Sequence, residues 1–249
     1  MAVVAALRVA PVKGLATTSR DRIWIDEQGV AEDRRIFLLD GQGAVVTLRT
    51  HPALVQFTPT LDLDRALLTV VSPDGLLATS CLDDADTRVA AHLYGKDRAG
   101  RVLAGDIADV LSAAAGEDVR VVVADGTGIG WDEGPVSILG RASAAAVGGS
   151  DRDRARYRML VEVDDTAPYE EDTWVGTDVQ IGDARVRVTH QLQRCAIITQ
   201  SPITGRKDWD GLKALAHERG ADMLCLGVIA DVLEPGEVTV GAQVTPQVG

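Results

Sequence analysis

The thiol of Cys195 has the most reactive setting in the sequence. It directly follows Arg194 and comes just after an alternating apolar segment. A neighbouring guanidinium favours the thiolate, which is the form that binds soft metals and acts as a nucleophile. The local residues are equally compatible with a buried, inert cysteine. Of the other two thiols, Cys225 lies in the apolar run 223–226, which favours burial, and carboxylates after Cys81 disfavour a thiolate there.

Other patterns that carry chemistry elsewhere are weak in this chain. Gly126, Gly128 and Gly130 form a GxGxG string without the GxGxxG spacing of a dinucleotide site, which favours a loop or hinge. The four histidines have no ligand-like spacing, and the sequence has no HExxH, CxxC or GxSxG. A zinc site built from local spacing and a serine hydrolase therefore lack support. The charges of residues 151–156 alternate in sign, which predicts a solvated face.

The charge balance narrows the possible partners. The chain has 249 residues and 37 acidic against 25 basic side chains, a net charge of −12. This excludes a protein that coats nucleic acid, although a local basic pocket remains compatible with it. No window reaches the roughly 18–20 apolar residues of a membrane span, and the apolar start lacks the basic segment of a signal peptide. Three scattered cysteines are too few for a disulfide framework, so we expect a cytoplasmic protein. From the net charge and the lack of a membrane-spanning window, we expect no nucleic-acid or membrane partner.

Short alternating apolar runs, separated by turns, predict mainly strands. Hairpins are expected between residues 36–39 and 44–47, 61–64 and 67–71, and 179–181 and 184–188, with a further strand at 238–240. Helices are expected at residues 106–114, 141–147 and 210–219. The pattern is typical of barrels or sandwiches. The glycine-rich stretch 125–134 is typical of a connection between domains, and we expect a domain boundary between residues 100 and 134. We therefore predict two domains, residues 1–105 and 106–249.

Short strings in a fixed order extend along nearly the whole chain. They are Pro11-Val12-Lys13, Asp33-Arg34, Thr47-x-Arg49-x-x-Pro52-x-Leu54, Ala142-Ser143, Arg158, residues 169–176, Arg194-Cys195 with the following Pro202-x-Thr204-Gly205, and residues 233–236. In their order and joint spacing they are similar to the MOSC (molybdenum-cofactor sulfurase C-terminal) family with its N-terminal β-barrel domain. The chain resembles the amidoxime-reducing component and related bacterial members of that family.

The resemblance implies a mainly β fold (α+β, with a few helices) of two β-barrel-type domains that enclose a cofactor cleft. In members that hold molybdopterin, the cysteine at the position of Cys195 ligates molybdenum, so Cys195 is the implied catalytic residue and metal ligand. The implied cofactor-binding residues are Lys13, Arg34, Arg49, Asp132, Arg158 and Arg194. Because the molybdenum cofactor carries a phosphate, several cations inside an acidic protein suit it.

Three functions follow from the resemblance. The leading hypothesis is a molybdenum-dependent oxidoreductase that removes oxygen from N-oxygenated small molecules and takes electrons from a separate donor protein. The second keeps Cys195 without molybdenum, as a sulfur transferase or as a lyase or isomerase of a small anionic substrate. It is motivated by Met159-Leu160, which stand where the family has Pro-Asn. The third is a non-catalytic carrier of the cofactor or of sulfur.

Overall fold

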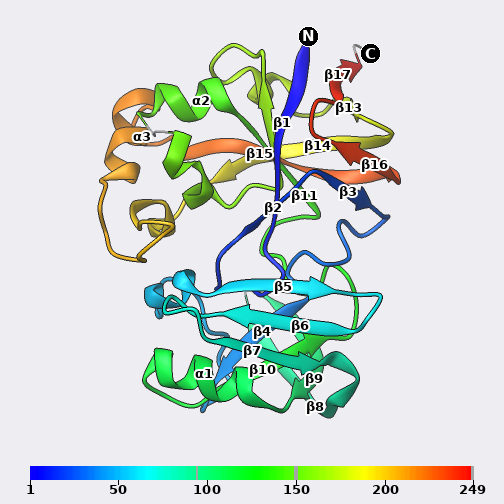
Figure 1. Ribbon diagram of the computed structural model, residues 1–249. Coiled ribbons are helices and arrows are strands. Elements are labelled where there is room, and N and C mark those ends of the chain that lie inside the picture. Colours follow the sequence, from blue (N-terminus) through cyan, green and yellow to red (C-terminus); the bar gives the residue numbers. More distant parts are fainter. Residues whose placement is uncertain (94, 149–150, 248–249) are drawn as a thin grey trace.

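The largest sheet of this computed structural model closes into a barrel of seven strands (Figure 1). The structure describes residues 1–93, 95–148 and 151–247. Around the barrel the strands are β12 (Val161–Asp164), β11 (Val136–Gly140), β15 (Cys225–Glu234), β14 (Ala184–Gln193), β13 (Asp178–Ile181), β17 (Gln243–Gln247) and β1 (Ala2–Val9). Because β1 pairs with both β17 and β12, the first strand of the chain closes a barrel otherwise built from residues after 135.

Strand alternation fills this barrel. Val179 and Ile181 of β13 and Val186 and Val188 of β14 are fully buried, while the residues between them are more exposed. A period of two is expected where one face of a strand packs against a core. Two short additions flank the barrel: β2 (Thr18–Arg20) pairs with β1, and β3 (Arg22–Ile25) pairs with β16 (Gly236–Thr239).

The N-terminal domain consists of two sheets around one core. The four-stranded sheet has the order β4 (Ile36–Asp40), β10 (Val119–Ala124), β9 (Lys96–Leu103) and β8 (Ala85–Leu93). The three-stranded sheet contains β5 (Thr58–Asp62), β6 (Leu67–Val71) and β7 (Leu77–Cys81). Leu38, Leu68 and Leu111 come from the two sheets and from α1 (Asp106–Ala115), and they pack in one apolar cluster. In Figure 1 this domain lies at the end of the barrel opposite the two chain termini.

Helices are few and short in the described part of the chain. Besides α1, which ends at Gly116 in the left-handed conformation, they are α2 (Arg141–Ala146) and α3 (Gly211–Arg219). The 3₁₀ helices are η1 (Pro52–Gln56), η2 (Leu82–Asp84), η3 (Asp151–Tyr157), η4 (Glu170–Trp174) and η5 (Ala196–Thr199). None of these described helices has the length and apolar character needed to cross a membrane.

The predicted fold class is confirmed, as are the hairpins β5–β6 and β13–β14 and the three helices. The hairpin predicted between residues 36–39 and 44–47 is wrong in its second arm. Residues 44–47 make only the single bridge Leu39–Val45, because the chain turns away at Thr47 and buries Val46 and Leu48 in the N-terminal core.

The division after residue 105 stays a prediction, and the elements are grouped differently in space. α1 and β10, which follow that position, pack with the N-terminal sheets. β1, which precedes it, is part of the barrel. Between β1 and β2 the chain enters the N-terminal core with Val12 and Leu15 and returns to the barrel. It leaves the barrel again after β3 and comes back between β10 and β11.

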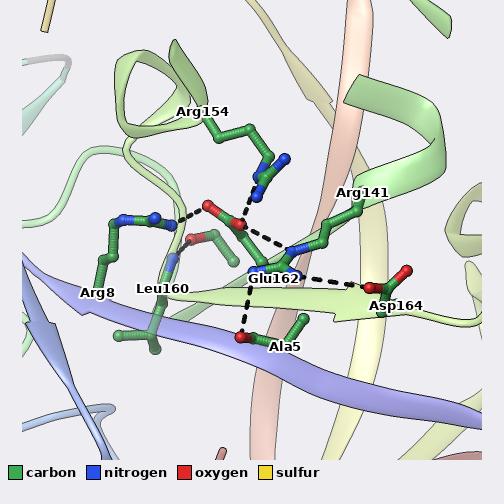
Figure 2. A network of polar contacts seen from close by, with 8 residues as sticks. Ala5, Arg8, Arg141, Arg154, Leu160, Glu162 and Asp164 are labelled. Atoms are coloured by element: carbon green, nitrogen blue, oxygen red, sulfur yellow. Dashed lines mark hydrogen bonds and ion pairs between the residues drawn. The ribbon is translucent and has the colours of Figure 1, made fainter. Parts of the chain in front are cut away.

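A buried carboxylate joins four elements where β1 closes the barrel (Figure 2). Glu162 of β12 is only 2% exposed. It accepts hydrogen bonds from Arg8 of β1, from Nε of Arg154 in η3 at 2.9 Å, and from Nε of Arg141 at the start of α2 at 3.4 Å. Arg141 also donates to the carbonyl of Ala5 at 3.2 Å. One carboxylate thus links β1 to β12, η3 and α2, in addition to the backbone pairing of β1 with β12 and β17.

We expect Glu162→Gln to lower the free energy of unfolding by about 3–5 kcal/mol, because it leaves the buried Arg154 and the partly buried Arg8 and Arg141 without their counter-charge. Urea unfolding measures this change. Asp164→Asn is the matched control, since Asp164 pairs with Arg141 at 3.4 Å but is half exposed, and its loss should cost less than about 1 kcal/mol. Equal losses in the two variants would contradict a role for Glu162 in barrel closure.

Candidate functional site

A cavity of about 400 Å³ is lined by residues of both domains. All seven residues predicted for the site line it: Lys13, Arg34, Arg49, Asp132, Arg158, Arg194 and Cys195. Six basic and three acidic side chains face this cavity, so the lining is net positive in a chain whose net charge is −12. The structure therefore brings the predicted residues together, and their roles in binding stay predictions.

Lys13 lies in the segment that follows β1. Its backbone N–H donates to the carbonyl of Ile36 at 2.8 Å, which fixes the segment against β4. Its ammonium group is buried, donates to the carboxylate of Asp132, and lies 3.3 Å from the carbonyl of Gly130. Burial lowers the pKa of Lys13 to about 8, although Asp132 opposes the shift. Burial of the Lys13 ammonium in its charged form therefore costs free energy.

Arg34 and Arg158 lie next to each other, and both have left-handed backbone conformations, with φ of 51° and 55°. Arg34 pairs with Asp33 and its Nη2 lies 3.4 Å from the carbonyl of Arg158, whose own Nη1 donates to the carbonyl of Leu15 at 2.8 Å. Burial, followed by the charge of Arg34, lowers the pKa of Arg158 to about 10. Burial also opposes ionisation of Arg34, but Asp33 and Asp132 outweigh it and raise its pKa. Strained backbone of this kind is concentrated at functional sites.

Arg194 and Cys195 follow the end of β14 and point to different surroundings. The guanidinium of Arg194 donates to the carbonyl of Tyr157 at 2.6 Å and lies over the Tyr157 ring at 5.5 Å. Burial lowers the pKa of Arg194 to about 10. Its Nε is buried, and no described residue accepts its hydrogen bond. Cys195, by contrast, is exposed at the cavity, so the alternative of a buried, inert cysteine is wrong.

Asp132 and Arg49 complete the predicted set. Asp132 lies in the loop between β10 and β11, and its side chain is 44% exposed. Burial opposes its ionisation, but Lys13 outweighs that effect and lowers the pKa of Asp132. Arg49 is an exposed residue of the turn that follows Leu48. The two residues therefore line a part of the cavity that solvent reaches.

The prediction of a solvated face at residues 151–156 is wrong for the two arginines whose side chains the structure describes; the side chains of residues 151–153 lie outside the described set. Arg154 is 9% exposed and Arg156 is 3% exposed. Arg156 donates to the carbonyl of Ile198 at 3.0 Å, pairs with Asp208 at 3.1 Å, and lines the cavity. Sequence reasoning missed Arg156 because its partners lie more than forty residues further along the chain.

Leu160 lines the cavity, whereas Met159 lies behind it in a buried apolar cluster. Both are buried, and the N–H of Leu160 donates to Oγ of Ser137 at 2.9 Å. Met159 packs against Gly227, where an added Cβ would lie 2.8 Å from its terminal methyl group. Neither side chain offers the amide that the family resemblance implies at this position, so Leu160, which faces the cavity, presents hydrocarbon there.

The other two thiols are less accessible than Cys195. Cys81 and Cys225 are both half-buried, so the burial predicted for Cys225 is only partial, because it begins β15 opposite the exposed Gln193. Burial raises the pKa of Cys225, which disfavours its thiolate. Among the described residues, no cluster of three or more His, Cys, Asp or Glu side chains could hold a metal ion.

Comparison with known proteins gives two family matches and several relatives. Residues 1–118 match the model of the MOSC N-terminal beta barrel domain, and residues 130–245 match that of the MOSC domain. The chain is 27% identical over 241 residues to the molybdenum cofactor sulfurase of Caenorhabditis briggsae, and 25% identical over 232 residues to that of Caenorhabditis elegans. These alignments cover 91% and 88% of this chain but only 33% and 32% of the two relatives.

A solved structure, the YuaD protein from Bacillus subtilis, aligns with 98% of this chain and 94% of its own, with a TM-score of 0.45 and 12% identity.

We expect Cys195 to react fastest of the three thiols with an aromatic disulfide reagent in the cofactor-free protein, because it alone among them is exposed. Variants that each retain one cysteine make the three rates separately measurable. A slower reaction at Cys195 than at Cys81 would contradict the accessible thiol.

The lowered pKa of Lys13 predicts that the free energy of unfolding rises with pH. Its pKa is about 8 in the folded chain against 10.5 ordinarily, so between these values the unfolded chain holds a proton that the folded chain has released. Stability therefore rises with pH in this interval. Relative to Lys13→Met, the native protein should gain up to about 3 kcal/mol between pH 7 and 10.5, as measured by urea unfolding. Lys207→Met, which alters an exposed lysine, is the control, and the same pH trend in it would contradict the assignment.

Proposed function

Because this chain belongs to the MOSC family, with a MOSC N-terminal barrel domain before a MOSC domain, we propose that its cleft binds the molybdenum cofactor. We further propose that the protein is an oxidoreductase that acts on N-oxygenated small molecules. The observation that carries the proposal is the meeting of an exposed thiol with buried cations around one cavity. The chain spans about a third of the length of the sulfurases it matches, so the activity of the full-length sulfurases is not assigned to it.

The residues present fit such a cofactor. A cavity of about 400 Å³ has the size of a small-molecule site. The buried Nε of Arg194 lacks an acceptor among the described residues, and an anionic ligand would supply one. Thiolate is a donor that suits a metal with sulfur-rich coordination. Lys13, Arg34 and Arg158 together suit a phosphate, because charge-assisted hydrogen bonds to anions are the strong ones.

Each residue has a distinct task in this proposal. Cys195 provides the protein's thiolate ligand to the metal, and its exposure leaves room for a substrate beside it. Lys13, Arg34 and Arg158 bind and orient the anionic end of the cofactor. Arg194, anchored on the carbonyl of Tyr157, holds a positive charge next to the thiolate.

When bound, the cofactor supplies oxygen-atom abstraction at a redox-active metal. Reduction of an N-hydroxyl group to the amine consumes two electrons and two protons and releases water. In this proposal the electrons come from a separate donor protein, and the substrate is a small molecule that enters beside Cys195.

A second candidate keeps the thiol and omits the metal. The exposure of Cys195 favours it, because a thiol that passes sulfur to another molecule must be reachable from solvent. In this alternative, the Cys195 thiolate attacks the outer sulfur of a donor persulfide, forms the Cys195 persulfide and releases the donor thiolate. Mass spectrometry of protein treated with a small persulfide donor, with Cys195→Ser as control, identifies this species.

The cofactor proposal predicts close to one molybdenum atom per chain in protein purified from a host that makes the cofactor. Cys195→Ser should lose most of the metal and all reduction of an N-hydroxyamidine with a chemical electron donor, because the thiolate ligand is gone. Cys225→Ser is the matched control and should keep both, since Cys225 is outside the cavity lining. Elemental analysis and product chromatography measure the two effects. Repeated absence of molybdenum from the unaltered protein would instead favour the metal-free candidate.

A further inference from the structure

The loop that joins β10 to β11, residues 125–135, brings a carboxylate onto the cationic part of the cavity. Gly130 lies so close to Arg34 that an added Cβ would be 1.9 Å from the Arg34 carbonyl oxygen. This close approach directs the Gly130 carbonyl toward Lys13 and places the carboxylate of Asp132, two residues later, on the same ammonium group.

Of the two carboxylates near Lys13, Arg34 and Arg158, one is fixed and one is replaceable. Asp33 is 6% exposed, pairs with Arg34 and accepts a hydrogen bond from the N–H of Ala10 at 2.7 Å, so it is part of the fold. Asp132 is 44% exposed, and its carboxylate contacts the Lys13 ammonium without a backbone donor of its own among the described contacts. Loss of the Asp132 contact therefore costs the protein less than loss of the Asp33 contacts.

An anion that enters the cavity must compete with Asp132. Lys13 presents one ammonium group, and two negative charges a few ångströms apart on it repel each other strongly in a partly buried site. Because its side chain is 44% exposed, Asp132 can leave Lys13 by rotation of that side chain alone, while the carbonyl of the neighbouring Trp131 stays bonded to Arg98 at 3.0 Å.

We propose that Asp132 is an internal competitor of the anionic ligand: it neutralises Lys13 when no anion is bound and is displaced from it when a phosphate group binds. This inference rests on the proposed function in one respect, that the cavity takes an anion. It gives Asp132 a role opposite to that of a cofactor-binding residue, because its removal should strengthen binding.

Inorganic phosphate is the probe, titrated by calorimetry at constant ionic strength into protein from a host that makes no molybdenum cofactor. We expect Asp132→Asn to lower the Kd of phosphate by about tenfold, the scale of one removed charge contact. Glu133→Gln is the matched control. It removes the same charge from the next residue of the same lining, but Glu133 lies near His190, at 3.9 Å, and makes no described contact with Lys13. Its Kd should change less than about twofold.

Equal or weaker phosphate binding by Asp132→Asn would overturn the inference, and so would equal tightening in Glu133→Gln, which would indicate an effect of net charge alone. Asp132→Ser must tighten binding as well, and thermal melts of both variants verify that they fold. If the unaltered protein binds phosphate and Asp132→Asn binds it with the same Kd, only this inference is removed and the anion-binding cavity stands. Absence of phosphate binding in every variant removes the anion-binding cavity, and with it the proposed function.

Discussion

Burial of positive charge between the two domains is the constraint on which the cleft depends. An ammonium or guanidinium group taken from water costs several kcal/mol unless acceptors replace the lost hydration. Here the acceptors are backbone carbonyls of Gly130, Leu15 and Tyr157, which serve Lys13, Arg158 and Arg194. The bond from Arg158 to Leu15 joins the barrel side to the N-terminal core, so the cationic part of the site is complete only when the two bodies are docked.

The barrel provides rigid starting points for these loops. Cys195 follows the end of β14, and Lys13 follows the end of β1, so both leave strands whose partners are fixed on each side. Asp132 comes instead from the connection between β10 and β11, and its side chain is partly open to solvent. The cavity thus combines a thiol and cations that start from barrel strands with one acidic side chain on a loop.

Local features were readable from the sequence, and features set by distant contacts were not. The hairpin β13–β14 was predictable because alternation and a glycine turn act over ten residues. The same alternation of charge misled at Arg156, whose burial is decided by Asp208 and by the carbonyl of Ile198. The seven residues that the family resemblance predicts for the site line one cavity, and their roles stay predictions, whereas sequence alone left open whether Cys195 is exposed. Neither could reveal that β1 belongs to the barrel, because its partners are about 160 and 240 residues away.

That placement of β1 has a consequence for synthesis. A ribosome makes β1 long before its two neighbours in the barrel, β12 and β17. Until then its apolar residues, such as Val4 and Leu7, have no barrel to enter. The N-terminal sheets contain only later segments and can assemble before it. The nascent chain must therefore hold β1 without its barrel partners while the segments between are made, and β17 then completes the barrel beside it.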